Sequence, residues 1–371
     1  MRIKCEKSIL QNGINIVAKA VAQKTPNFIL ECIFIEAKNG SLKLTANNLS
    51  LGIETYIDCT IVEEGSIAVN AKLFSDIIRK LPDYEVDIES DKDYETTIIC
   101  GKTRFQIKCW SGDTFPELSS VNKEKSITLS QMSLRDIIKQ TIFSVADNEN
   151  NKLMSGEYFE VVDNTLSVTS LDGHRISKRK IDLKGDNSDV KAVVPGKTLM
   201  ELNKIINGES EDDVIVYFGD SIISFEFNNT RVVSRLIEGE YFKISHMLSM
   251  DTEILVKANR NELIGCIDRS SLLIQENDRK PIIVSVKNDN NLYIRLDTNV
   301  GSIKEEMEIE KEGGELIIGF NPNFLMDSLR AIDDEVVNIY MNDSKSPCLI
   351  KDDNETYTYI ILPININTEA Y

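Results

Sequence analysis

The two histidines of the chain are the first candidates for chemistry, because an imidazole exchanges protons near neutral pH. His174 stands in the segment LDGHRI, two residues after Asp172, and His246 stands in the segment ISHML. An aspartate beside a histidine suggests acid–base catalysis, but such catalysis also needs a nucleophile or a bound substrate near the imidazole, and no motif marks either. An enzyme that uses His174 therefore remains an alternative without a marked substrate site.

Sequence motifs for phosphate, ester or metal chemistry do not occur. The chain contains no GxxxxGK[ST], GxSxG or HExxH segment, and its PGKT turn lacks the upstream glycine of a phosphate-binding loop. The seven cysteines are scattered, odd in number and never spaced as CxxC, which predicts reduced thiols in the core rather than a disulfide frame or a zinc site. We therefore expect no catalytic residue, no metal and no cofactor.

Composition and charge indicate an acidic globular chain. Its 371 residues are 42% hydrophobic and 27% charged, which suits two or three domains of ~100–200 residues each. No apolar run approaches the ~18–20 residues of a membrane span and the N-terminus lacks a signal-peptide core, so we expect a cytoplasmic protein. The net charge of −18 argues against a protein that coats nucleic acid, because phosphate binding needs clustered Lys and Arg.

A threefold internal repeat organises these elements. The segments VNAKLFSDIIRKL, VPGKTLMELNKII and FNPNFLMDSLRAI begin at Val69, Val194 and Phe320, and each predicts a short turn followed by an amphipathic helix. The strand-like runs GSLKLTA, NTLSVTS and NNLYIRL recur at intervals of 124 and 126 residues, and KTRFQIKC, NTRVVSRL and ETYTYIIL close the copies. The same order at nearly constant spacing predicts tandem triplication.

Each copy also opens with a helical pattern, which is weakest in the third copy. Two helices and several strands per copy predict an α+β unit in which helices pack on antiparallel sheets. We place the domain boundaries in polar stretches, giving domains at 1–124, 125–249 and 250–371. Three such units in a row are expected to curve, and two curved chains can close a symmetric ring.

These segments resemble the beta subunit of bacterial DNA polymerase III, the DNA sliding clamp, over essentially the whole chain. The most specific stretch is SLDGHRIS at 170–177, supported by VVPGKTLMELNKII, RLIEGEYFKI, GFNPNFLMDSLRAI and YIILPI in the same order. The resemblance implies a non-catalytic processivity factor, a head-to-tail homodimer that encircles duplex DNA. It implies as further partners the polymerase III alpha subunit, the clamp loader, repair polymerases and other proteins with clamp-binding peptides. A scaffold that never encircles DNA is the second alternative.

A ring that holds DNA topologically tolerates an acidic surface if its basic residues face the hole. Acidic residues crowd predicted strands and loops, as in DYEVDIESDKDYE, whereas the predicted helices carry Lys and Arg, so we expect acid outside and base within. A solvated helix face explains any single one of these charges equally well. The residues expected near DNA are Arg79, Lys80, Lys139 and Lys204 on helices and, from the resemblance, Lys24, Lys152, Lys197, Arg279 and Lys280 in loops.

The resemblance also implies a groove between the second and third domains that binds short linear peptides. Apolar walls with a few polar groups suit a peptide anchor. Three positions depart from the family pattern, because Phe242, His246 and Asn365 stand where relatives often have Pro, Arg and a basic residue. Core packing is the competing explanation for Phe242 and Met247. The matching positions are Met154, Leu171, Gly173, His174, Arg175, Ile176, Phe242, His246, Met247, Asn321, Phe324, Lys345, Pro347, Ile360, Ile361, Leu362, Pro363 and Ile364.

A dimer joint is implied at one edge strand of the first domain and one of the third. The matched apolar residues are Phe105 and Ile107, facing Leu272 and Leu273. Alternation in RFQIKC places Phe105, Ile107 and Cys109 on one face, and an exposed edge of this kind invites pairing with another chain. Burial inside one domain is the competing explanation.

Overall fold

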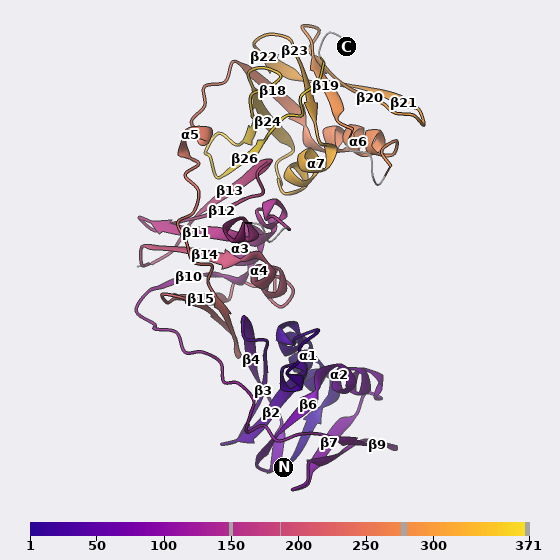
Figure 1. Cartoon of the computed structure of the whole chain (residues 1–371), viewed down its shortest axis with the longest axis vertical. Coiled ribbons are helices and arrows are strands. Elements are labelled where there is room, and N and C mark those ends of the chain that lie inside the picture. The colour runs from indigo at the N-terminus through magenta and orange to yellow at the C-terminus, as the bar shows by residue number, and fades with distance from the viewer. Residues whose placement is uncertain (148–150, 186, 276–279, 368–371) are drawn as a thin grey trace. The chain divides into compact units, whose positions relative to one another are not determined.

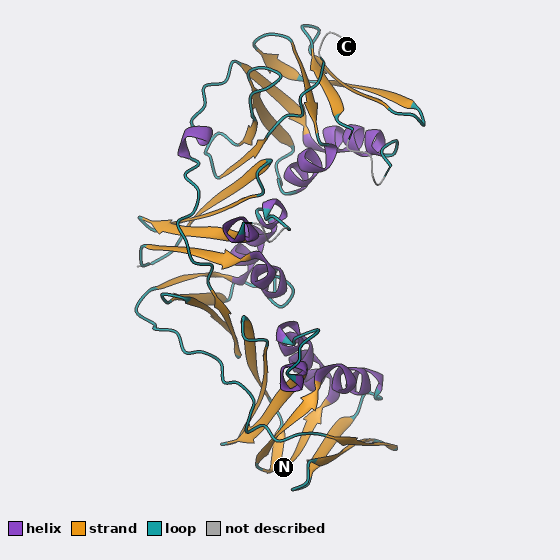
Figure 2. Ribbon diagram, in the orientation of Figure 1, coloured by secondary structure: helices purple, strands orange, loops and turns teal. Residues whose placement is uncertain are grey.

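The computed structural model describes the chain except residues 148–150, 186, 276–279 and 368–371. It separates into two compact units, and in each unit helices pack against antiparallel sheets (Figures 1 and 2). Unit 1 comprises Met1–Leu134, Lys184–Ser188 and Lys197–Leu236, and unit 2 comprises Arg135–Leu183, Asp189–Gly196 and Ile237–Tyr371.

Unit 1 contains two sheets. The five-stranded sheet has the order β5 (Thr60–Glu63), β1 (Arg2–Glu6), β7 (Glu85–Ser90), β8 (Glu95–Cys100) and β9 (Thr103–Lys108). The eight-stranded sheet has the order β10 (Ser126–Ser130), β15 (Asp213–Phe218), β16 (Ile222–Phe227), β17 (Thr230–Arg235), β4 (Leu51–Ile57), β3 (Ser41–Asn47), β2 (Cys32–Lys38) and β6 (Gly65–Asn70). The pairing of β17 with β4 joins strands of the first and second repeats.

Unit 2 also contains two sheets. The nine-stranded sheet has the order β14 (Val190–Pro195), β11 (Gly156–Val162), β12 (Thr165–Leu171), β13 (Arg175–Asp182), β26 (Tyr357–Ile361), β25 (Cys348–Lys351), β24 (Val336–Met341), β18 (Ile254–Asn259) and β22 (Glu310–Glu312). The four-stranded sheet has the order β21 (Ser302–Glu308), β20 (Asn291–Asp297), β19 (Ile282–Val286) and β23 (Leu316–Phe320). The pairing of β13 with β26 joins strands of the second and third repeats.

The longer helices bury one apolar stripe, and an asparagine side chain caps the start of α2, α6 and α7. In the first helix, Leu10, Ile14 and Val17 are fully buried. The Oδ1 atom of Asn70 accepts a hydrogen bond from the N–H of Leu73 at 3.0 Å and so caps the second helix. The helices are α1 (Lys7–Val17), α2 (Ala71–Lys80), α3 (Gln131–Lys139), α4 (Gly196–Leu202), α5 (Ser245–Leu248), α6 (Arg260–Ser271) and α7 (Pro322–Arg330), with 3-10 turns η1 (Ala18–Ala20), η2 (Phe28–Glu31), η3 (Ile142–Ser144) and η4 (Lys152–Ser155).

The predicted repeat is confirmed by equivalent elements at the matched positions. Leu42, Leu166 and Leu292 are buried in β3, β12 and β20. The helices α2, α4 and α7 each follow a strand with at most one residue between. The third opening helix, which had the weakest pattern, is α6 and contains 12 residues. The domain boundaries near 124 and 249 stay predictions.

The cysteines follow the prediction for core thiols. All seven are free, and only Cys59 is not buried. Burial raises the pKa of Cys5 and of Cys32 to about 12, which disfavours their thiolate forms. Within the described part of the chain, no helix is long and apolar enough to cross a membrane.

Candidate functional site

The turn between β12 and β13 is shaped by Asp172. Its Oδ1 atom accepts hydrogen bonds from the backbone N–H groups of His174, at 2.9 Å, and Arg175, at 3.1 Å. Gly173 has a φ of +90°, a backbone conformation that residues other than glycine rarely adopt. The Asp172 carboxylate therefore supports the turn backbone and the Arg175 side chain, so the interactions described for it give no acid–base dyad with the His174 ring.

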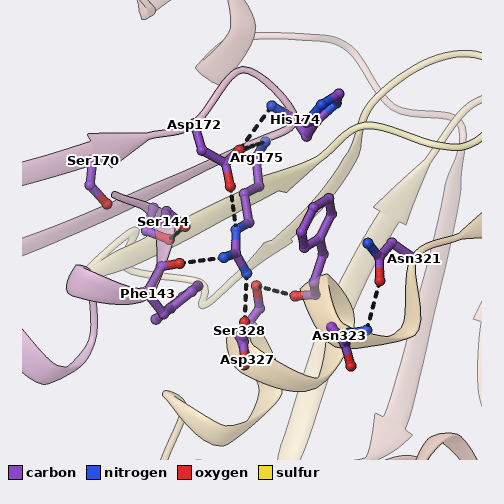
Figure 3. A network of polar contacts seen from close by, with 12 residues as sticks. Phe143, Ser144, Ser170, Asp172, His174, Arg175, Asn321, Asn323, Asp327 and Ser328 are labelled. Carbon is purple, nitrogen blue, oxygen red and sulfur yellow. Dashed lines mark hydrogen bonds and ion pairs between the residues drawn. The ribbon is translucent and has the colours of Figure 1, made fainter. Parts of the chain in front are cut away.

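Arg175 links this turn to two further elements (Figure 3). Its Nε donates to Oδ2 of Asp172 at 2.9 Å, and its Nη1 donates to Oδ2 of Asp327 in α7 at 2.6 Å. Its Nη2 donates to the backbone oxygen of Phe143 in η3. The guanidinium carbon lies 4.5 Å from the ring centroid of Phe324, a cation–π contact, and only 11% of the Arg175 side chain is exposed. Arg175 thus ties β13 to η3 and α7.

An apolar cluster forms where β12, β13, β26 and β25 lie side by side. Ile176 is paired with Ile360, and Ile360 is paired with Leu349, so side chains from neighbouring strands meet on one face. We call this group the β13–β26 cluster. Its buried members are Leu171, Ile176, Val193, Tyr241, Leu349 and Ile360, and its half-buried members are Leu153, Met154, Tyr158, Ile237, Phe242, Ile244, Met247, Leu248 and Tyr340.

Six of the residues predicted for the peptide groove come together in this cluster: Met154, Leu171, Ile176, Phe242, Met247 and Ile360. The resemblance did not mark Val193, Tyr241 or Leu349. For Leu349 the short apolar run Cys348–Ile350 was a usable signal, and Tyr241 directly precedes Phe242, whereas nothing local marks Val193.

The remaining predicted groove residues lie around the cluster or in the neighbouring core. Phe324 and Ile361 pack with the core of the third repeat, and the Phe324 ring stacks near His174 with centroids 6.1 Å apart. Asn321 caps α7 through its side chain. Gly173, His174, His246 and Lys345 are exposed, and Pro347, Leu362, Pro363 and Ile364 are half-buried.

The segment after the last strand, β26, hydrogen-bonds to the turn between β12 and β13 and to β23. The N–H of Leu362 donates to the oxygen of His174 at 2.9 Å, and the N–H of Ile364 donates to the oxygen of Gly319 at 2.8 Å. These bonds place the YIILPI ending beside the LDGHRI turn.

Most basic residues predicted to meet DNA are exposed. Lys80 and Lys139 are the last residues of α2 and α3, where a cation is favourable at the helix C-terminus. Lys204, predicted on a helix, instead lies two residues beyond α4 and pairs with Glu201 at 2.7 Å. Arg79 pairs with Asp76, and Lys24 and Lys152 are exposed. Lys197 was predicted in a loop, but it is an exposed residue in the first turn of α4. Lys280 is half-buried, and Arg279 lies outside the described residues.

Of the predicted dimer residues, Phe105 and Ile107 lie on an edge strand, whereas Leu272 and Leu273, expected at an edge strand of the third domain, directly follow α6. β9 is an edge strand of its sheet, and Phe105 is 37% exposed. Ile107 is half-buried, whereas Cys109, expected on the same face, is buried beyond the end of β9. Leu272 is 80% exposed at the C-terminus of α6, and Leu273 is half-buried against the core of unit 2.

The chain contains three copies of an α+β unit, and strands of adjacent copies pair within one sheet. This is the architecture of a DNA sliding clamp. Family models described as the N-terminal, central and C-terminal domains of the DNA polymerase III beta subunit match residues 1–119, 128–243 and 246–365. The chain therefore belongs to the DNA polymerase III beta subunit family. Its function is that of the family, a non-catalytic clamp that makes a DNA polymerase processive.

Relatives and solved structures agree with this membership. The chain is 32% identical to the beta sliding clamp of Staphylococcus epidermidis over 374 residues, which covers 98% of this chain and 99% of that protein. A putative DNA polymerase III beta subunit from Eubacterium rectale is 52% identical, with a TM-score of 0.95 over 99% of this chain and 100% of that one. The Bacillus subtilis DNA polymerase sliding clamp is 28% identical, also with a TM-score of 0.95 and the same coverage.

Proposed function

We propose that two copies of this chain close head to tail into a ring around duplex DNA, and that each copy tethers replication and repair proteins through the β13–β26 cluster. The observation that carries the tethering role is the set of half-buried apolar side chains in that cluster. Met154, Phe242 and Met247 are partly open to solvent above the buried residues Leu171 and Ile360. Half-buried apolar side chains of this kind leave solvent-exposed apolar surface that a partner can cover.

The occupant that fits this surface is a short peptide with large apolar side chains. Buried residues form the floor, half-buried ones form the walls, and exposed polar groups such as His174 and Lys345 stand near the ends of the flanking elements. Such a surface suits anchoring side chains of a linear motif more than a folded domain. The partners we propose are the polymerase III alpha subunit, the clamp loader and repair polymerases with such motifs.

A charge placed among these half-buried side chains tests whether the β13–β26 cluster binds peptides. Met247→Glu puts a carboxylate among apolar side chains without disturbing a buried position, because Met247 is half-buried in α5. We expect at least about ten-fold weaker binding of a polymerase-derived peptide, about 1.4 kcal/mol, in a fluorescence titration. Val300→Glu, at a side chain 57% exposed in the same unit, is the control and keeps the affinity. Equal affinity for both variants would remove the cluster from the groove.

The dimer joint that we propose is formed by β9 of one copy and β21 of the other. Both strands lie at sheet edges, where unpaired backbone groups are available. β9 carries Arg104 and Lys108 and no acidic residue, whereas β21 carries Glu305, Glu306 and Glu308 against a single Lys304. These opposite charges favour the head-to-tail pairing over pairing of like edges.

The exposed Lys and Arg at the C-terminal ends of α2 and α3 support the proposed DNA contact. Their side chains are long and solvated, so they attract phosphates without reading bases. The ion pairs of Arg79 and Lys204 are exposed and cost little to exchange for a phosphate. A protein that acts on chromosomal DNA in a bacterium works in the cytoplasm, and we propose that location here.

A further inference from the structure

The sheet face that carries the β13–β26 cluster also carries a row of residues around Lys178. Lys178 stands two residues after Ile176 in β13, so both side chains lie on the same face of the sheet. Across the strands, Thr169 of β12 and Thr358 of β26 are paired with Lys178. Tyr158, a half-buried member of the cluster, is paired with Thr169 in the same row. Lys178 therefore lies next to the apolar surface that we propose for peptide binding.

The row of Lys178 has an equivalent in unit 1, where the charges are paired. The equivalent residues, 124 positions earlier and paired across the strands in the same order as Tyr158, Thr169 and Lys178, are Phe34, Thr45 and Glu54. Glu54 is paired with Arg231 of β17, as Lys178 is paired with Thr358 of β26. The Nη1 atom of Arg231 lies 3.5 Å from Oε1 of Glu54, which makes an ion pair. Two charges thus neutralise each other in unit 1, whereas in unit 2 the lysine faces a threonine.

Lys178 is a half-buried cation without a partner of its own. Within the described residues no carboxylate forms an ion pair with it, and the two that act on it at longer range, Glu160 and Glu355, are already paired with other lysines. Burial lowers the pKa of the Lys178 ammonium. The ion pairs of neighbouring lysines on this face are Lys180 with Glu355 at 3.9 Å, Lys191 with Glu160 at 3.2 Å and Lys351 with Glu355 at 3.0 Å. A carboxylate brought to Lys178 would offset the loss of solvation that its neighbours do not offset.

We propose that Lys178 is a specificity-determining residue of the peptide groove, and that it binds a carboxylate that flanks the apolar anchors of the partner peptide. This inference rests on the proposed peptide-binding role of the β13–β26 cluster. Ile176 and Lys178 are two residues apart, about 7 Å along a strand, so an acidic side chain next to an anchor reaches the ammonium while the anchor contacts the cluster. The groove then selects peptides that combine large apolar residues with an adjacent Asp or Glu.

Paired peptides test this preference for a carboxylate. The probes are labelled polymerase-derived peptides in which one aspartate is placed at each position flanking the apolar anchors in turn, together with the same peptides carrying asparagine. The receptor is the full chain, and the affinity is measured by fluorescence titration. At one flanking position we expect the aspartate peptide to bind about five- to ten-fold tighter than its asparagine counterpart. Equal affinities for aspartate and asparagine at every position would overturn the proposal.

Substitution of Lys178 assigns the preference to this residue. Lys178→Met removes the charge but keeps a long apolar stem, so a lysine that only covers its neighbours with methylene groups is replaced without effect. We expect Lys178→Met to bind the two peptides equally and to keep the affinity of the unaltered chain for the asparagine peptide, which also shows that the variant is folded. Lys178→Arg keeps a cation and should preserve the preference for aspartate.

Lys180→Met is the matched control for Lys178→Met. Lys180 lies on the same strand and the same face but is two residues farther from the cluster and is paired with Glu355. Its substitution should leave the preference for aspartate unchanged. A preference that survives in Lys178→Met, or one that is lost equally in Lys180→Met, would overturn the role of Lys178.

Met247→Glu separates this inference from the proposed groove. The substitution should weaken the binding of the aspartate and the asparagine peptide alike, because it acts on the surface that contacts the anchors. If it weakens both while Lys178→Met leaves their affinity ratio unchanged, the groove stands and the role of Lys178 is contradicted. If it weakens neither, the proposed groove itself is contradicted, and this inference with it.

Discussion

The Nη1 atom of Arg175 donates to Oδ2 of Asp327 at 2.6 Å, and this ion pair joins the start of β13 to α7. The same guanidinium binds Asp172 and the backbone of Phe143 and lies over the Phe324 ring. With its donors used inside the chain, Arg175 is suited to position the proposed groove rather than to meet a charge on the peptide.

This pair is expected to couple the stabilities of the two elements. In a double-mutant cycle of Arg175→Ala and Asp327→Ala, we expect a coupling free energy of about 1–2 kcal/mol, measured by urea unfolding. Partial exposure of Asp327 keeps the value below that of a buried pair. The control cycle uses the exposed pair Arg330–Asp268, 3.7 Å apart, and should give close to zero. Similar coupling in the two cycles would contradict the positioning role.

Glu157 predicts a pH-dependent stability. Its side chain is fully buried in β11, and burial raises its pKa well above the usual value, an effect that the nearby Thr141 hydroxyl opposes only in part. The unfolded chain ionises first as the pH rises, so stability falls from near pH 4.5 upward until the raised folded pKa is reached. Glu157→Gln should remove up to about 1.4 kcal/mol per pH unit of this slope in urea unfolding between pH 5 and 8. An unchanged slope would show that Glu157 is not the group responsible.

A charge on β9 should separate the proposed dimer. Phe105→Asp introduces a carboxylate on an edge strand whose partner strand is acidic. We expect monomers in sedimentation velocity at concentrations where the unaltered chain is dimeric. Val62→Asp, on β5 at the opposite edge of the same sheet, is the control and should remain dimeric. Dimers of both variants would place the joint elsewhere.

Loss of single helix-end lysines should weaken DNA attraction without changing sequence preference. Lys80→Ala and Lys139→Ala should each lower the slope of log affinity against log salt by about one, measured with short duplexes. Lys191→Ala removes an exposed lysine from β14 instead and should leave the slope unchanged. Equal slopes for all three variants would contradict a basic surface at the helix ends.

The fold could be predicted from the sequence because apolar residues repeat at regular intervals, both within each element and from one copy of the repeat to the next. Leu42, Leu166 and Leu292 repeat at nearly equal intervals, and each is buried in the matching strand. Apolar alternation and helix caps are local signals, so they survive in a single sequence. The limit appeared at Lys204, where a helical pattern continued beyond the observed end of α4.

The candidate site could be predicted from the sequence less completely than the fold, because its contacts join segments that are distant in the sequence. Arg175 and Asp327 are 152 residues apart, and no sequence pattern in either segment predicts their ion pair. The family resemblance identified six members of the β13–β26 cluster, but the role of Arg175 depends on its contacts with Asp327 and Phe143, which lie far from it in the sequence. Burial of Glu157 likewise depends on how β11 is covered and not on its own residue pattern.

Retention on DNA tests the proposed ring most directly. The chain is loaded onto nicked circular plasmid by a clamp loader, isolated by gel filtration in moderate salt, and compared before and after the plasmid is linearised. A topological ring predicts that the protein stays on the circle and is lost from the linear form, because only free ends let it slide off. Equal retention on both forms, or equal loss from both, would contradict the account.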